Sequence, residues 1–148
     1  MEFDVVRVVE HIHGHLGWLT AAVIVHPAIL LRDRERSAHL SVGLATGLLT
    51  LEWALGAWLY GPYRARLQPH IFTDARWIGV MFERKEHLAM GALLLTWAAA
   101  SAYAIAIGAR DEVGARMRTF AHHAFVIAAA LLVVTACLGT LVASYDTF

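Results

Sequence analysis

Four stretches of the chain are almost continuously apolar, and short charged segments separate them. They run from Leu16 to Leu31, from about His39 to Tyr60, from about His87 to Ile107 and from about Phe125 to Tyr145. A helix needs about 20 mostly apolar residues to cross the hydrocarbon core of a bilayer. The first stretch is shorter, but residues 5–12 extend it as an amphipathic lead-in. Helices are the spanning form that this pattern favours, because membrane strands alternate polar with apolar residues in closed barrels.

We therefore predict an all-α integral membrane protein with a single domain over residues 1–148. Its helices are expected at about 5–31, 39–61, 84–108 and 119–145. The connections at 32–36 and 110–118 are short and rich in Arg, and short links place neighbouring helices antiparallel. The prediction is an up-down-up-down four-helix bundle. The side with these two loops is called side B; side A carries the two termini and the 61–86 connection.

The 61–86 connection has its own helix signals. Gly61 and Pro62 predict the end of the second helix, and Thr73 or Asp74 is expected to cap a new one. Apolar residues then recur at helical spacing through Trp77 and Phe82. We expect a short interfacial helix in this connection, either separate from the third membrane helix or continuous with it.

Composition and charge agree with a membrane protein. The chain is 59% apolar and 16% charged, against roughly 45–50% and about 25% in soluble domains. Its formal net charge is zero, which argues against nucleic-acid binding. The side B arginines lie closest to helix ends, so we expect side B in the cytoplasm and both termini on the non-cytoplasmic side. Gly43 and Gly47 form a small-xxx-small pair suited to close helix packing, within the bundle or in a homo-oligomer.

The nine histidines are the unusual feature, because ionisable groups in membrane segments are costly and often functional. They fall into two layers near the helix ends. The side A layer holds His11, His13, His15, His70 and His87, and the side B layer holds His26, His39, His122 and His123. We expect His13, His70 and His123 to be solvated. A single histidine at a membrane helix end is most often an interfacial residue.

His15 and His26 are eleven residues apart, which returns a helix to within about 20° of the same face. One helix can thus present an imidazole toward each side of the membrane. Imidazole is a common axial ligand of haem iron, and bundle cores hold such cofactors between facing helices. We predict that His15 with His87 holds a side A haem b. His26 or His39, paired with His122, would hold a second one.

Two further sets of residues carry chemistry. Glu52 lies thirteen residues into the second apolar stretch, where a carboxyl can relay a proton or bind a quinone. The opposite interpretation is a neutral Glu bonded to a neighbouring helix. A rival metal site on side A would combine Glu10, His13, Glu83 and His87, because carboxylate and imidazole clusters suit non-haem transition metals. The charged run at 83–87 otherwise indicates a solvated helix end.

Helix number, size and histidines near both membrane faces make the whole chain resemble the four-helix membrane cytochromes b, in particular the bacterial b561-type quinol-linked proteins. The resemblance implies bis-His haems, electron exchange with quinones or a redox partner subunit, and a bacterial inner membrane. The expected function is a membrane b-type cytochrome. The alternatives are a cofactor-free membrane anchor of a larger complex and a non-haem metal-binding membrane protein.

Overall fold

The computed structural model describes residues 4–33, 36–109 and 111–145, and these are helical apart from short connections. The helices are α1 (Val5–Val23), α2 (Val25–Arg32), α3 (His39–Arg66), α4 (Gln68–Asp74), α5 (Arg76–Gly108) and α6 (Glu112–Tyr145). With α1 and α2 counted as one span, four helical segments within these described residues are long and apolar enough to cross a membrane. The prediction of an all-helical chain with four long apolar helices is confirmed. Arg34, Arg110 and residues 146–148, which entered the orientation argument, lie outside the described residues.

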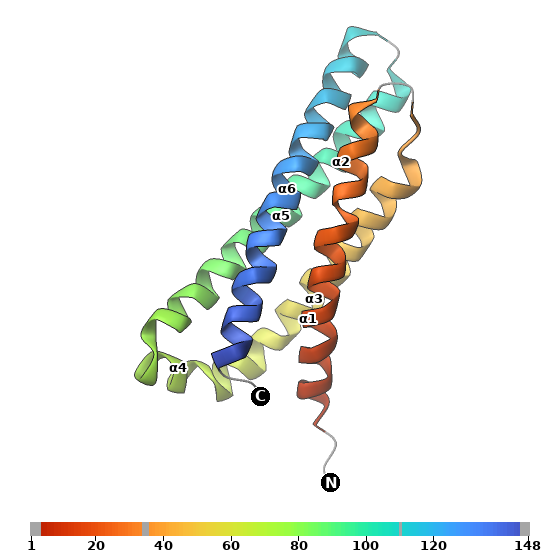
Figure 1. Cartoon of the computed structure of the whole chain (residues 1–148). Helices are drawn as coiled ribbons and strands as arrows, with labels where there is room; N and C mark the ends of the chain where they lie inside the picture. Colours follow the sequence, from red (N-terminus) through yellow and green to blue (C-terminus); the bar gives the residue numbers. More distant parts are fainter. Residues whose placement is uncertain (1–3, 34–35, 110, 146–148) are drawn as a thin grey trace.

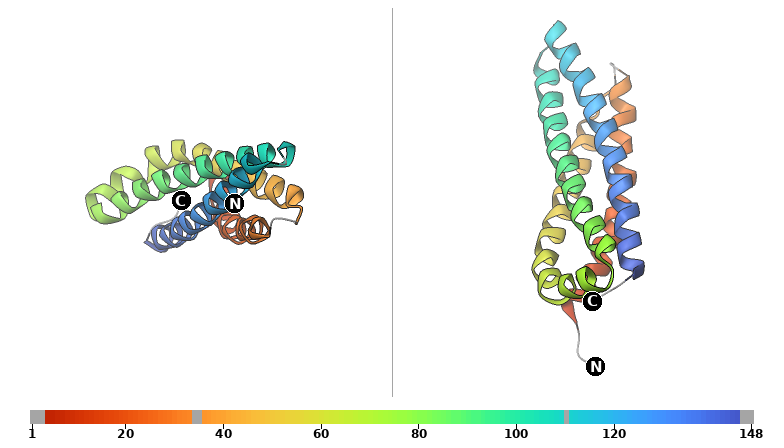
Figure 2. Two further views of the ribbon diagram at one scale, coloured as in Figure 1. Left: turned by 90° about the horizontal axis from the view of Figure 1, so that it is seen from above. Right: turned by 90° about the vertical axis from the view of Figure 1, so that its left-hand side faces the viewer.

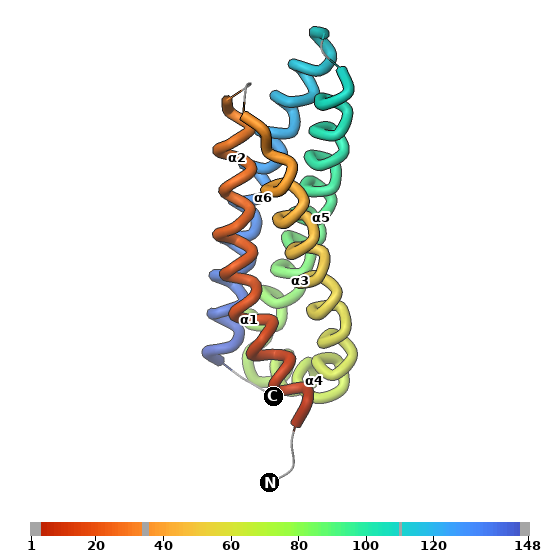
Figure 3. Tube along the Cα trace, turned by 90° about the vertical axis from the view of Figure 1, so that its right-hand side faces the viewer, coloured from red at the N-terminus to blue at the C-terminus, as the bar shows by residue number. Residues whose placement is uncertain are grey.

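The long helices form an elongated bundle (Figure 1). Within the described part of the chain, α1 packs on α3 and α6, while α5 packs on α3 and, over most of its length, on α6. The chain thus closes a ring of neighbours in the order α1, α3, α5 and α6, which the view along the bundle in Figure 2 makes visible. The start of α1, the end of α6 and α4 lie at the same end of the molecule (Figures 1 and 3).

The first predicted helix is interrupted. α1 begins after Asp4, whose side chain accepts the backbone N–H of Val6 at 3.0 Å, and it ends before Ile24. α2 then starts at Val25 and contains Pro27. Proline has no N–H to give to the carbonyl four residues earlier, and its ring crowds that carbonyl. The break at Ile24 therefore follows from Pro27, and it separates His15 on α1 from His26 on α2.

The prediction that the second helix ends at Gly61-Pro62 is wrong. Pro62 lies inside α3, which continues to Arg66. The next residue, Tyr63, is 2% exposed and stacks on Phe82 of α5 with ring centroids 3.7 Å apart. Burying a large aromatic side chain stabilises by a few kcal/mol, roughly the cost of a proline inside a helix. Packing on α5 therefore carries the helix past the proline.

The caps of the following helices also differ from expectation. Thr73 and Asp74 belong to α4, the short helix in this connection, and the residue that precedes α5 is Ala75. Trp77 and Phe82 are part of α5, so the segment after α4 is continuous with the third long helix. α5 and α6 both begin earlier than the predicted 84 and 119. Before α6, Asp111 Oδ1 accepts the backbone N–H groups of Val113 and Gly114 at 3.1 and 3.2 Å.

Two buried clusters hold the bundle together. The larger one fills the half toward side B and is rich in alanine, which lets helices approach closely. The smaller one surrounds α4 and includes Tyr63, Ile71 and Val142. Outward-facing side chains are strongly apolar: Leu40 is 75% exposed and Leu94 62%. An apolar surface of this extent is rare on soluble monomers and suits contact with lipid.

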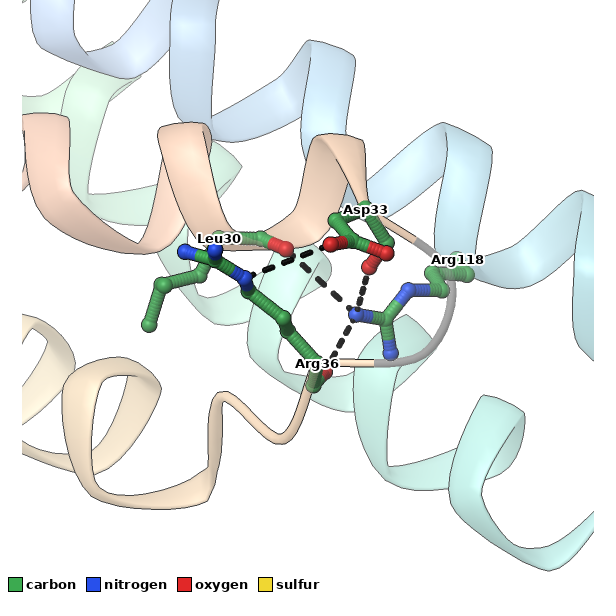
Figure 4. A network of polar contacts seen from close by, with 4 residues as sticks. All are labelled: Leu30, Asp33, Arg36 and Arg118. Carbon is green, nitrogen blue, oxygen red and sulfur yellow. Dashed lines mark hydrogen bonds and ion pairs between the residues drawn. The ribbon is translucent and has the colours of Figure 1, made fainter.

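Arg118 of α6 ties the side B end of the bundle (Figure 4). Its Nη2 atom donates to the backbone oxygens of Asp33 and Arg36, both at 2.6 Å, and lies 3.5 Å from the oxygen of Leu30. The last carbonyls of a helix have no partner within it, so a cation at the end of α2 satisfies them. Arg118 therefore fixes the turn between α2 and α3 against α6.

Candidate ligand-binding cavity

A cavity of about 680 Å³ lies in the side A half of the bundle, between the two buried clusters. Residues of α1, α3, α5 and α6 line it, and Leu67 and Ile71 close the end next to α4. The lining is mainly apolar and aromatic, including Trp18, Trp53 and Phe82. Cavities of this size and character hold small organic molecules in proteins, with a few polar groups fixing orientation.

The central polar contact of the cavity joins α1 to α3. Nδ1 of His13 lies 3.0 Å from Oε1 of Glu52, and the two side chains are 23% and 12% exposed. Nδ1 of His13 has no hydrogen-bond partner among the described residues, so the contact with Glu52 is an ion pair when His13 is protonated. The other carboxyl oxygen of Glu52 is buried and has no hydrogen-bond partner among the described residues. The expectation that His13 is solvated is therefore wrong.

Two glycines make room for this pair. A Cβ atom at Gly56 of α3 would lie 3.0 Å from Cε1 of His13, and a Cβ atom at Gly17 of α1 would lie 3.1 Å from Oε1 of Glu52. Each helix thus carries a polar residue and, four residues later on the same face, a glycine. The polar residue of one helix lies over the glycine of the other. This reciprocal arrangement brings α1 and α3 close enough for the two side chains to meet.

α5 contributes two charged residues to the cavity. Lys85 and Glu86 line it, although the run at 83–87 was expected to be a solvated helix end. The Lys85 ammonium lies 4.5 Å from the centre of the Phe82 ring, and it interacts electrostatically with Glu86, Glu52 and Glu10. The expectation holds for Glu83 and Arg84, which are exposed. The cavity therefore combines carboxylates, an imidazole and an ammonium within apolar walls.

The predicted side A haem pair is not arranged around this cavity. His15 is an exposed residue of the lining, whereas His87 is exposed and is not a lining residue. Nδ1 of His87 is 2.7 Å from the backbone oxygen of Glu83 on its own helix. The histidines that line the cavity, His11, His13 and His15, all come from α1.

The side B histidines each have a partner within the bundle. Nδ1 of His26 is 2.8 Å from the Ser41 hydroxyl, and Nδ1 of His122 is 2.8 Å from the backbone oxygen of Ala28. His39 packs against Tyr103 with ring centroids 5.5 Å apart. His122 is half-buried, while His26 and His39 are exposed.

The rival metal set is divided between two environments. Glu10 and His13 line the cavity, but Glu83 and His87 are exposed outside it. Over residues 4–33, 36–109 and 111–145, no three His, Cys, Asp or Glu side chains gather closely enough to hold a metal ion.

Comparisons with known proteins add nothing to this geometry, because no protein family, no curated protein and no solved structure matches the chain significantly. The site is therefore defined by its own chemistry. Sequence reasoning identified Glu52 but missed Lys85, Glu86 and Tyr63 as cavity residues. Gly17 follows His13 by four residues, and Gly56 follows Glu52 by four residues. This matching spacing was the signal that could have placed His13 opposite Glu52.

Proposed function

We propose that the chain is an integral membrane protein whose four spans alternate in direction. The support is the length and apolar character of the spans, the exposed apolar side chains and the position of the start of α1 and the end of α6 at one end of the bundle. We further propose a bacterial inner membrane with the termini on the non-cytoplasmic side, from the arginines at the side B helix ends. Reporter fusions at Met1 and after Phe148 test this orientation.

Within that protein, we propose that the cavity binds a membrane-diffusible quinone or quinol. The observation that carries this proposal is the His13–Glu52 pair at 3.0 Å in the wall of an apolar, aromatic cavity of about 680 Å³. An apolar ring with a long apolar tail can reach such a cavity from the bilayer. Its oxygen atoms require a hydrogen-bond donor and a group that exchanges protons, and a carboxyl–imidazole pair provides both.

The chemistry assigned to the pair is proton exchange at the ring oxygen. Oxidation of a quinol to a quinone releases two protons and two electrons. The pair accepts the two protons in turn and passes the first to water before it takes the second, and both electrons pass to a redox partner subunit. In the reverse direction the same pair donates the protons. The protein's contribution is to bind and orient the ring and to exclude bulk water from it.

Fluorescence of the purified, detergent-solubilised protein tests the binding. Trp18 and Trp53 line the cavity, so a decyl-substituted benzoquinone bound there should quench their emission with saturation. Glu52→Gln should weaken the apparent affinity about tenfold, because a hydrogen bond to a charged group contributes about 1.5 kcal/mol or more. Glu112→Gln is the matched control, since Glu112 is 79% exposed and far from the cavity lining. No saturable quenching, or equal affinities in both variants, would refute the proposal.

A second candidate, the b-type cytochrome, is favoured by the histidine hydrogen bonds. With Nδ1–H donated to a backbone carbonyl, as the contacts of His87 and His122 allow, the Nε2 lone pair is free for a metal. A haem on these residues would supply one-electron chemistry and accept the quinol electrons. We propose the pairs His15 with His87 and His26 or His39 with His122 as ligands. The reduced-minus-oxidised visible spectrum tests this candidate. A colourless protein that also binds no quinone would favour the cofactor-free membrane anchor instead.

A further inference from the structure

Tyr63 lies in the cavity wall, and its buried hydroxyl group has no hydrogen-bond partner among the described residues. The residue is 2% exposed. Two other aromatic rings lie beside its ring. Phe82 stacks on it at 3.7 Å with an interplanar angle of 11°, and Tyr60 lies 6.0 Å away at 29°. The position of the hydroxyl is therefore set by packing and not by hydrogen bonding.

An unpartnered buried hydroxyl needs an explanation, because a phenylalanine would fill the same space without the loss of hydration. The hydroxyl of the other buried tyrosine in the described residues, Tyr103, accepts the backbone N–H of Ala38 at 2.8 Å, whereas the hydroxyls of Thr46 and Thr96 are buried without a partner. The ordered ring of Tyr63 presents a donor where no protein acceptor exists. A ligand oxygen in the cavity is the acceptor that this arrangement fits.

The position of Tyr63 sets where that oxygen would lie. The His13 ring is in contact range of Gly56, and Tyr63 follows Gly56 by seven residues, on nearly the same face of α3 and about 10 Å further along its axis. Helical side chains tilt toward the N-terminus, so Tyr63 leans back toward the level of His13. The two groups therefore lie at different levels of α3, so one ring can meet both only if it carries oxygen atoms on opposite edges.

We propose that Tyr63 donates a hydrogen bond to the second oxygen of the ligand, opposite the His13–Glu52 pair. This inference rests on the proposed quinone site and specifies its ligand as a para-quinone or para-quinol, bound by both edges. Lys85 supports the same end, because its ammonium lies over the Phe82 ring on which Tyr63 stacks.

The test compares Tyr63→Phe with the wild type, using two probes in the tryptophan-quenching titration. The first probe is the decyl para-benzoquinone, and the second is a decyl-substituted ring with a single carbonyl. Tyr63→Phe should lose about tenfold in affinity for the para-quinone and little for the one-carbonyl ring, while its thermal stability stays equal or rises. Tyr145→Phe is the matched control, because Tyr145 is 48% exposed and packs on Trp77 outside the cavity lining.

The outcomes separate the two proposals. Wild-type protein that binds neither probe refutes the quinone site itself. A para-quinone affinity that depends on Glu52 but is unchanged in Tyr63→Phe refutes only the second hydrogen bond. Equal losses for both probes would mean that the hydroxyl acts through the structure of the cavity, and they also refute it.

Discussion

Replacement of Arg118 by methionine should destabilise the bundle more than any other single charge removal on side B. Methionine keeps much of the length and apolar stem but loses the guanidinium. The Nη2 atom has two N–H groups, and the two backbone oxygens at 2.6 Å use both of them. The 3.5 Å approach to Leu30 adds little.

The magnitude follows from these two bonds. A hydrogen bond to a charged group contributes about 1.5–3 kcal/mol, and solvent screening reduces this value for contacts at the exposed end of the bundle. Two such bonds give an expected loss of about 2–3 kcal/mol. For a chain of this length each kcal/mol corresponds to about 2–4 °C, so the unfolding temperature should fall by about 5–10 °C.

Thermal unfolding in detergent, followed by circular dichroism, measures this effect. Arg116→Met is the matched control on the same helix. Arg116 pairs with Glu112 at 2.6 Å, but the side chains are 72% and 79% exposed, so its loss should cost less than about 0.5 kcal/mol. Arg118→Lys should lie between the two, because lysine keeps a charge without the planar fork. The reasoning fails if Arg118→Met unfolds at the same temperature as Arg116→Met.

Two further predictions concern glycines. Gly56→Ala should weaken quinone-probe binding several-fold, because the added Cβ atom would lie 3.0 Å from the His13 ring. Gly43→Ala is the control, because a Cβ atom there meets nothing within 4 Å. It should leave binding unchanged and raise stability by up to about 1 kcal/mol. The double variant Gly43→Leu, Gly47→Leu should abolish any dimer seen by light scattering in detergent, because both glycines face outward. A dimer that persists in the double variant would show that the chains associate through another surface.

The fold was largely predictable because membrane spans are encoded by length and apolar composition. Predicting the four long helices required only this approximate rule of length and composition. The ends of the helices were harder to predict from the sequence, because they depend on contacts between segments distant in sequence. Pro62 indicated a helix end, but the packing of Tyr63 on Phe82 carries α3 past it. Thr73 and Asp74 had the side chains of a cap, yet α4 includes both.

The candidate site was predictable only in part. Glu52 stood out because a carboxyl within an apolar stretch is costly, and that physical argument requires no knowledge of the fold. Its partner could not be chosen in the same way. His11, His13 and His15 are the same residue type and closely spaced, so only the rotation of α1 against α3 decides which of them meets Glu52. Haem ligation by His15, His26, His39, His87 and His122 stays a prediction.

The sequence itself encodes the rotation of α1 relative to α3, but it does so through pairs of residues and not through single ones. His13 and Gly17 share one face of α1, and Glu52 and Gly56 share one face of α3. Close approach of the two helices requires a small residue wherever the other helix places a large polar one. His11 and His15 each have a larger residue, His15 and Leu19, four positions later. Of the three imidazoles, only that of His13 therefore lies beside space for a facing side chain, and this selects it as the partner of Glu52.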